Sequence, residues 1–198
     1  MKLVAFDTST EACSVAVQID GEVRCDHRIV QREHANLLLT MVRGLLDQFS
    51  VKPIELDGVV FGQGPGSFTG VRIAAAAAQG LALAAGCGVQ GVSSLQAMAR
   101  ACFRERGTPA DNSEWIIAAL DARMDQIYIN CYAAQAGVFE LGDEAVVNAD
   151  DYRLPIPQKD PKKGSRHQEQ SATHSVNKLV LCGSGAERYE STLTSRLT

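Results

Sequence analysis

The sequence predicts an α/β fold made of two domains with the same βββαβα-type plan, the second of them shortened. The chain opens with three strand-like segments joined by short turns, and an apolar stripe of helical period follows them. Residues 107–113 are rich in Gly, Pro, Asp, Asn and Ser, as a linker would be, and a second set of strand-like segments begins after them. We therefore expect domains at residues 1–106 and 107–198.

The first domain is expected to begin as an antiparallel meander and to continue with helices that alternate with strands. Residues 14–19 alternate between apolar and polar, and Asp20-Gly21 is a typical hairpin turn. Apolar residues at spacings of three and four from Leu37 to Phe49 predict an amphipathic helix, which Pro53 ends. The expected elements are strands at 3–6, 14–19, 22–30, 58–61 and 89–92, helices over 37–49 and from 69 onward, and a helix to about Arg106 that opens with the capping box Ser93-x-x-Gln96.

The second domain is expected to restart the meander with strands at 115–120, 126–132 and 138–147. Residues 158–178 form a polar, locally basic segment, which favours a solvated loop over one that contacts RNA. A buried strand at 179–182 leads into a final helix, and the sequence ends at Thr198. We expect from this a shortened or truncated second domain.

Composition describes an ordinary globular protein with enough apolar residues, 45%, for a core. The net charge of −4 and the pI of about 5.6 provide no overall basic field, so any contact with RNA is expected to need a partner. Asp7 comes too early for a signal peptide, and we expect no apolar run to approach the roughly 20 residues of a membrane span. A cytoplasmic protein without membrane association is the expectation.

The cysteines and histidines do not favour a metal site. The six cysteines are scattered without a C-x-x-C pair, which is typical of reduced core thiols. His27 and His34 are seven residues apart, and neither has a histidine at the helical spacing of a two-ligand site. We expect no metal site and no catalytic residues.

The richest local signal is the loop from Gly62 to Arg72, which joins a buried strand to a helix that contains five consecutive alanines, Ala74 to Ala78. Its glycines allow close backbone approach, and its N–H groups could face a phosphate. Ser67 and Thr69 are better explained as helix caps than as nucleophiles, and Asp7 as a turn carboxylate. The residues considered for a shared nucleotide or phosphate contact are Asp7, Ser9, Thr10, Gly64, Gly66 and Ser67.

Two three-stranded meanders, each followed by helical crossovers, resemble the duplicated actin-like ATPase (ASKHA) fold. In that fold the first hairpin carries an Asp-x-Gly-Thr phosphate loop, and this chain has Asp7-Thr8-Ser9-Thr10 at the matching place. The missing glycine puts a side chain where the backbone should pass the phosphates. The resemblance implies no cofactor of its own, with ATP or ADP and magnesium only at an interface with a partner.

A closer resemblance covers most of the chain and is to the bacterial TsaB (YeaZ) family. The matching segments are Asp7-Thr8-Ser9, His34 ahead of Leu37-Leu38, Gly64 to Ile73, Gly80-Leu81-Ala82, Val92-Ser93-Ser94-Leu95 and Leu120-Asp121-Ala122-Arg123-Met124. That family is a catalytically inactive paralogue of the threonylcarbamoyl transferase TsaD. The resemblance implies a scaffold subunit that binds and activates TsaD, which modifies N6 of adenosine 37 in tRNAs reading codons that start with A.

The resemblance also implies partners and the surface that meets them. TsaD would pair with the helices from His34 and from Thr69, the ATPase TsaE would join the pair, tRNA would be met only through the complex, and the isolated chain would form a homodimer through the same surface. His34 could instead cap its helix, and Arg72 could instead make an internal salt bridge. The implied interface residues are His34, Leu38, Met41, Arg43, Leu45, Thr69, Arg72, Ile73, Ala76, Ala77 and Gly80.

Two other functions remain open from the sequence. One is an active small-molecule kinase or ATPase of the same fold, and the other is a glycoprotease-type peptidase. The sequence offers the peptidase neither a histidine pair for zinc nor a recognisable serine or cysteine triad.

Overall fold

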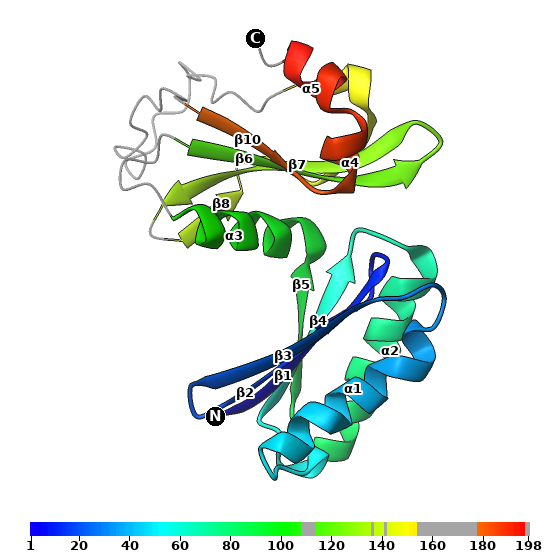
Figure 1. Ribbon diagram of the computed structural model, residues 1–198, viewed down its shortest axis with the longest axis vertical. Coiled ribbons are helices and arrows are strands. Elements are labelled where there is room, and N and C mark those ends of the chain that lie inside the picture. Colours follow the sequence, from blue (N-terminus) through cyan, green and yellow to red (C-terminus); the bar gives the residue numbers. More distant parts are fainter. Residues whose placement is uncertain (108–113, 136, 141, 154–177, 197–198) are drawn as a thin grey trace, which may run out of the picture. The chain divides into compact units, whose positions relative to one another are not determined.

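The computed structural model describes residues 1–107, 114–135, 137–140, 142–153 and 178–196. The chain divides into two compact units, Met1–Ser94 and Leu95–Thr198, and each contains a five-stranded sheet (Figure 1). The expected boundary at residue 106 is therefore wrong, because the first unit ends at Ser94. The linker predicted at 107–113 lies outside the described residues except for Gly107.

The sheet of the first unit has the strand order β3-β2-β1-β4-β5. Its antiparallel part is the predicted meander, in which β1 pairs with β2 and β2 pairs with β3. The parallel part adds β4 beside β1 and β5 beside β4. The strands are β1 (Lys2–Asp7), β2 (Ala12–Ile19), β3 (Glu22–Ile29), β4 (Gly58–Gly64) and β5 (Gly88–Ser93).

Both helices of the first unit, α1 (His34–Gln48) and α2 (Phe68–Ala85), lie on the same face of this sheet (Figure 1). A short 3-10 turn, η1 (Pro53–Glu55), follows α1 as the proline predicts. The predicted apolar stripe of α1 is its buried face, which packs with alternate residues of β1, β2 and β4. Small residues at intervals of four, Gly70, Ala74, Ala78 and Ala82, form the buried side of α2.

α2 corrects one expectation from the sequence. Among the described residues it is the one helix long and apolar enough to cross a membrane by length and composition, with 18 residues and a mean hydropathy of 1.3. The expectation that no apolar run approaches a membrane span is therefore wrong. Ala74 and Ala78 are nevertheless completely buried in the core of the unit, against the sheet.

The sheet of the second unit has the order β10-β6-β7-β8, with β9 also paired to β7. The segment expected as one strand at 138–147 forms two, because β8 and β9 pair with opposite ends of β7. β10 lies parallel to β6, as β4 does to β1. The strands are β6 (Glu114–Arg123), β7 (Gln126–Gln135), β8 (Gly137–Glu140), β9 (Ala145–Asn148) and β10 (Lys178–Cys182).

Helix α3 (Ser94–Arg106) explains where the unit boundary falls. Its residues Leu95, Ala99 and Phe103 repeat at intervals of four and are buried with Ile116 and Tyr132 of the second sheet. Although α3 follows directly after β5 of the first unit, its apolar face is therefore part of the core of the second unit.

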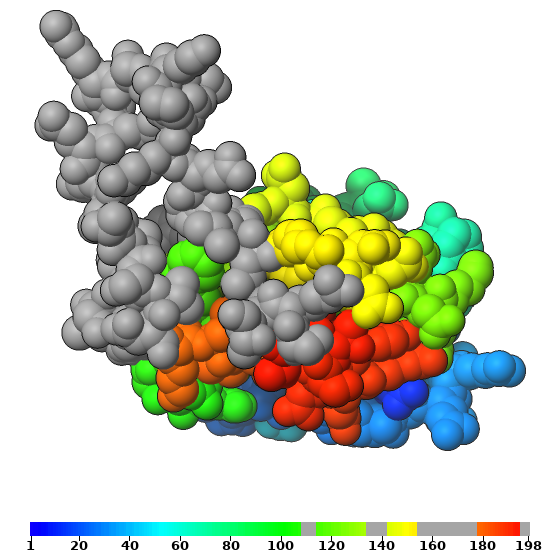
Figure 2. Space-filling model, turned by 90° about the horizontal axis from the view of Figure 1, so that it is seen from above, coloured from blue at the N-terminus to red at the C-terminus, as the bar shows by residue number. Residues whose placement is uncertain are grey.

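The other core of the second unit contains Trp115, Ile117 and Ala119 from β6, together with Ala186 and Leu193. These last two residues belong to α4 (Ser184–Arg188) and α5 (Glu190–Arg196). A 3-10 turn, η2 (Ala149–Asp151), packs beside α5, and Figure 2 shows this segment in yellow next to the red helices. The predicted polar loop at 158–178 lies outside the described residues except for Lys178.

Candidate functional site

The glycine-rich loop lies against the turn that follows β1. The Ser67 N–H donates to the Ser9 carbonyl oxygen at 2.7 Å, and the Thr8 hydroxyl donates to the Gly70 carbonyl oxygen at 2.7 Å. Thr8 and Ser9 are buried. The two segments that the sequence suggested for phosphate contact are therefore brought together, and they bind each other.

Three glycines of this region are required by that close packing. A methyl group at Gly62 would overlap the Asp7 carboxylate, and one at Gly70 would overlap the Thr8 carbonyl oxygen. At Gly66 it would lie 2.7 Å from Cβ of Ser9. The glycine pattern thus reflects contact between two backbone segments, which a bound phosphate would otherwise have explained equally well.

Asp7 and Ser9 are held by Ser94, which follows β5. The Asp7 carboxylate accepts hydrogen bonds from the Ser9 N–H and from the Ser94 hydroxyl, the latter at 3.1 Å. The hydroxyl oxygens of Ser9 and Ser94 lie 3.0 Å apart. These hydrogen bonds join the turn after β1 to the residue that follows β5, and they support the interpretation of Asp7 as a turn carboxylate.

Two N–H groups at the start of α2 also bond within the chain. Ser67 is the N-cap, and its hydroxyl accepts from the Gly70 N–H at 3.4 Å. The Val71 N–H donates to the Ser67 carbonyl oxygen at 2.9 Å. The capping role predicted for Ser67 is confirmed, whereas Thr69 lies inside the helix. Since the N–H groups of Ser67, Gly70 and Val71 all have partners within the chain, these donors are not free to cradle a phosphate.

A second candidate surface is the outer side of α1 and α2, opposite their buried faces. It exposes large apolar side chains: Leu39 is 52% exposed, Phe68 73% and Leu83 86%. Arg43, Ala76 and Gly80 are also exposed on these helices. We call this set of residues the α1–α2 surface. An exposed apolar patch of this kind is typical of a protein interface.

Arg72 has a partner that the sequence did not suggest. Its guanidinium lies 3.4 Å from the centre of the Phe68 ring, and Nη1 donates to the Phe68 carbonyl oxygen at 3.0 Å. Among the described residues no carboxylate pairs with Arg72, so the alternative of an internal salt bridge finds no support there. The stacked, exposed guanidinium remains available to an external acid.

Comparison with known proteins finds one family by sequence and by structure. The family model described as "TsaD: tRNA N6-adenosine threonylcarbamoyltransferase" matches residues 27–191. The solved structure "YeaZ from Pseudomonas aeruginosa" has a TM-score of 0.72 and 44% identity over 78% of this chain and 70% of that one. The chain belongs to the TsaB (YeaZ) family.

Curated members of the TsaB family support the same assignment. The Escherichia coli protein, "tRNA threonylcarbamoyladenosine biosynthesis protein TsaB", is 42% identical over 128 residues, which are 65% of this chain and 53% of that protein. The Haemophilus influenzae protein of the same name is 42% identical over 130 residues, 66% of this chain and 53% of that one. The chain thus spans about half the length of the curated relatives it matches.

The structure removes three residues from the interface that the TsaB resemblance implied. Leu38, Met41 and Leu45 are at most 4% exposed, because they form the buried face of α1 in the core. Ile73 and Ala77 are half-buried against the same core. A helix that covers a sheet offers only its outer side to a partner, and the sequence did not separate the two sides.

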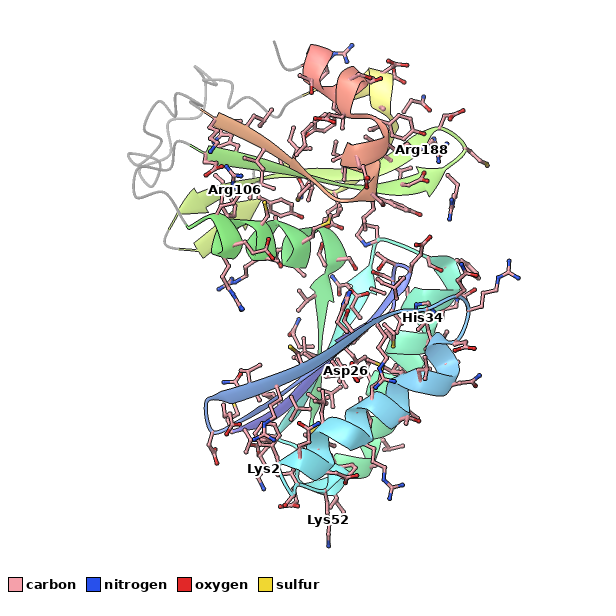
Figure 3. The ribbon with its side chains drawn as sticks, in the orientation of Figure 1. Lys2, Asp26, His34, Lys52, Arg106 and Arg188 are labelled. Carbon is pink, nitrogen blue, oxygen red and sulfur yellow. The ribbon has the colours of Figure 1, made fainter. Side chains whose placement is uncertain are left out.

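His34 is the first residue of α1, as Figure 3 shows, but it is not the cap. The N-cap is Glu33, which makes no side-chain hydrogen bond to the helix. The predicted capping role of His34 is therefore wrong. Its Nε2 atom is buried without a hydrogen-bond partner among the described residues.

Sequence reasoning missed several residues of these sites. Leu83 continues the outer row of α2 after Ala76 and Gly80, so the helical spacing of three and four would have found it. The contact of Ser94 with Asp7 was also missed, because the two residues are 87 positions apart in the chain.

A contact between Ser14 and His27 was also missed, with 2.8 Å from Oγ to Nδ1. The β1–β2 register puts Asp7 beside Ser14, whereas a catalytic triad needs the acid on the histidine. The pair therefore lacks the order of groups that a serine peptidase uses.

Proposed function

We propose that this protein is a non-catalytic scaffold subunit in the biosynthesis of threonylcarbamoyladenosine in tRNA, and that it acts by binding and activating TsaD. The names of its curated relatives support the pathway. The plan of both sheets, an antiparallel meander with a parallel strand beside its first strand, supports an actin-like fold and hence a paralogue of TsaD. The ATPase TsaE would join the pair in the cytoplasm.

The observation that carries the non-catalytic part of the proposal is the closed glycine loop. The Ser67, Gly70 and Val71 N–H groups bond within the chain, and the turn after β1 occupies the space beside the loop glycines. We therefore infer that the protein has no nucleotide cofactor of its own, and that any ATP or ADP with magnesium is shared with a partner. The acidic net charge supports contact with tRNA only through the complex.

The α1–α2 surface is the proposed docking site for TsaD. Large apolar side chains there are exposed beside small ones, so a partner helix could approach closely over Ala76 and Gly80 and cover Leu83 and Phe68. Full burial of one such large side chain contributes about 1.5–3 kcal/mol. A few of these contacts can dominate the affinity of an interface.

The test is to place a charge on this surface. Ala76→Arg and Leu83→Arg should each weaken TsaD binding, measured by calorimetry, at least about tenfold, because a charge must be desolvated in an apolar contact. Threonylcarbamoyl transfer by the assembled complex should fall in parallel. The matched control is Val146→Arg, since Val146 is a 51% exposed apolar residue of β9 in the second unit. Unchanged TsaD binding by both α1–α2 variants would overturn the docking assignment.

A further inference from the structure

Two of the cysteines, Cys102 of α3 and Cys182 of β10, meet in the second unit. Both are partly buried against the core that contains Leu95, Phe103 and Tyr132. Their thiols hydrogen-bond to each other, and neither is part of a disulfide. The sequence shows only scattered cysteines, whereas the fold brings these two together as a dithiol.

Packing at Gly183, the residue after Cys182, holds α3 close to β10. A methyl group at Gly183 would lie 2.6 Å from Cε of Met98 and 2.7 Å from its Sδ. Met98 and Cys102 are four residues apart on α3, so their side chains share one face of the helix. The two thiols are therefore held in contact by the packing of a helix against a strand.

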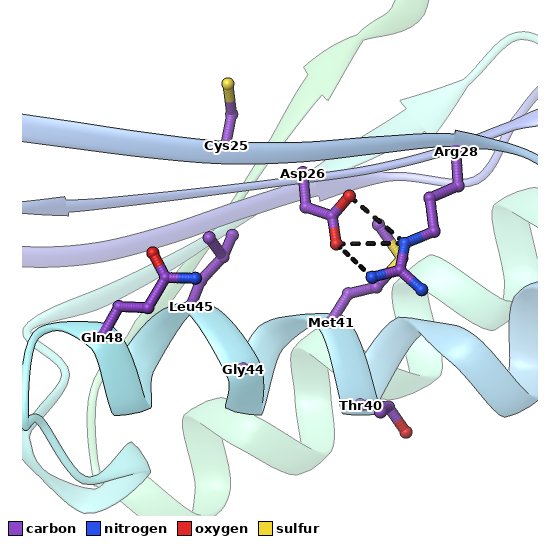
Figure 4. A pocket seen from close by; sticks show the side chains of 8 residues that line it. All are labelled: Cys25, Asp26, Arg28, Thr40, Met41, Gly44, Leu45 and Gln48. Carbon is purple, nitrogen blue, oxygen red and sulfur yellow. Dashed lines mark hydrogen bonds and ion pairs between the residues drawn. The ribbon is translucent and has the colours of Figure 1, made fainter.

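Cys25 is the contrasting case. It is exposed on β3, where its partner on β2 is Ala16. Figure 4 shows its sulfur pointing away from α1 and from the ion pair of Asp26 with Arg28. Such a thiol is open to any small reagent, but it needs a second molecule to form a disulfide. The dithiol of α3 and β10 has both sulfur atoms in one chain.

We propose that Cys102 and Cys182 are a modification site, at which a hydroperoxide forms a reversible disulfide that links α3 to β10. The Cys102 thiolate attacks the terminal peroxide oxygen, the O–O bond breaks, and the departing alcohol or water takes up the thiol proton. The Cys182 sulfur then attacks the sulfenic acid at Cys102, the S–O bond breaks, and hydroxide leaves as water with the Cys182 proton. The two electrons that the thiols lose reduce the peroxide, and a dithiol reductant reverses the reaction by exchange.

Cys102 is the thiol that reacts first. Burial raises the pKa of both thiols, and that of Cys182 to about 12. For the pKa of Cys102, the positive charge of Arg106, one turn further along α3, and the hydrogen bond with Cys182 act against burial and favour the thiolate. Once Cys102 is a sulfenic acid, Cys182 is its neighbour, and side-chain rotation is enough to reach the S–S distance of about 2 Å.

A small oxidant can reach the pair. Both cysteines keep part of their surface exposed, and Cys182 lines an open hollow of about 500 Å³ together with Leu181, Ser184 and Glu187. Cys131, by contrast, is completely buried in the same unit. The dithiol uses no residue of the α1–α2 surface, so the proposal does not rest on the docking of TsaD.

The first test is oxidation of the full chain with hydrogen peroxide, followed by alkylation of the remaining thiols and peptide mass spectrometry. A peptide pair linked through Cys102 and Cys182 should appear, and dithiothreitol should remove it. Cys102→Ala and Cys182→Ala should each abolish the link, whereas Cys25→Ala, the matched control, should keep it. In Cys182→Ala, dimedone should trap the sulfenic acid at Cys102. Links between other cysteines, or a wild-type chain in which this pair stays unlinked, would overturn the proposal.

The second test measures thermal unfolding by calorimetry. The disulfide would close a loop of about 80 residues and restrict the unfolded chain, so the oxidised protein should have a Tm higher by about 5 °C or more. Reduction should return the Tm to that of the untreated chain, and Cys182→Ala should have the same Tm before and after oxidation. An unchanged or lower Tm in the linked protein would mean that the bond forms only when α3 leaves β10, and it would contradict the proposed site.

Discussion

The close packing of the glycine loop against the turn after β1 predicts that substitution of Gly70 destabilises the first unit. An alanine there would place a methyl group onto the Thr8 carbonyl oxygen, with the Thr8 carbonyl carbon only 2.9 Å away. Both neighbours are backbone atoms, so a side-chain rotation cannot relieve the overlap. The turn after β1 must move away from α2, and the hydrogen bond from the Thr8 hydroxyl to Gly70 at 2.7 Å would weaken with it.

The loss of stability in Gly70→Ala is expected to come from two contributions, the steric overlap of the added methyl group and the weakened hydrogen bond from Thr8. Forcing an extra methyl group into a packed site costs about 1–3 kcal/mol. A lost buried hydrogen bond adds about 1 kcal/mol, so Gly70→Ala should destabilise the first unit by about 2–4 kcal/mol. For a unit of this length, each 1 kcal/mol corresponds to about 4–8 °C in Tm.

The assay is urea unfolding followed by circular dichroism, with Gly80→Ala as the matched control in the same helix. A methyl group at Gly80 meets no atom within 4 Å, so the control should gain about 0.5–1 kcal/mol from helix propensity. If Gly70→Ala were as stable as the wild type, the turn after β1 would not pack against α2 as described.

Three other predictions concern single side chains. Thr8→Val keeps the shape of a buried side chain but removes its hydrogen bond to the Gly70 carbonyl oxygen, so it should cost about 1 kcal/mol in urea unfolding. Burial raises the pKa of the Cys131 thiol to about 12, so iodoacetamide at about pH 8 should modify exposed Cys25 and leave Cys131 intact, as peptide mass spectrometry would show. Although burial raises the pKa of Asp121, hydrogen bonds from a main-chain N–H and from Arg188 at 2.8 Å lower it overall. Its stabilising contribution is therefore present above the unfolded value of about 3.9 and is lost as the pH falls through the lower folded value, so Asp121→Asn should make unfolding less dependent on pH in that window.

Local patterns predicted the elements of the first unit well. The turn Asp20-Gly21 and the stripe of α1 are set by interactions within a few residues, which the sequence displays directly. The unit boundary was misplaced because α3 looks the same in sequence whichever sheet it covers. Only the burial of Leu95 and Phe103 with Tyr132 decides that question.

The candidate site shows the same limit. Glycines at 62, 66 and 70 indicate that something approaches the backbone closely, but the sequence does not say whether it is a ligand or another segment of the chain. In the structure, the group that approaches the glycines is another segment of the chain, the turn from Asp7 to Ser9. Likewise, the stripe of α1 identified an important face without showing that Leu38 belongs to the core and Leu39 to the surface.

The most direct test of the account is nucleotide binding by the isolated chain. Because the Ser67, Gly70 and Val71 N–H groups already bond within the protein and the turn after β1 packs against the loop glycines, calorimetric titration with ATP and magnesium should show no saturable binding up to about 1 mM. Saturable binding in the micromolar range, weakened by substitution of Ser9 or Ser67, would contradict the closed loop and with it the proposed non-catalytic role.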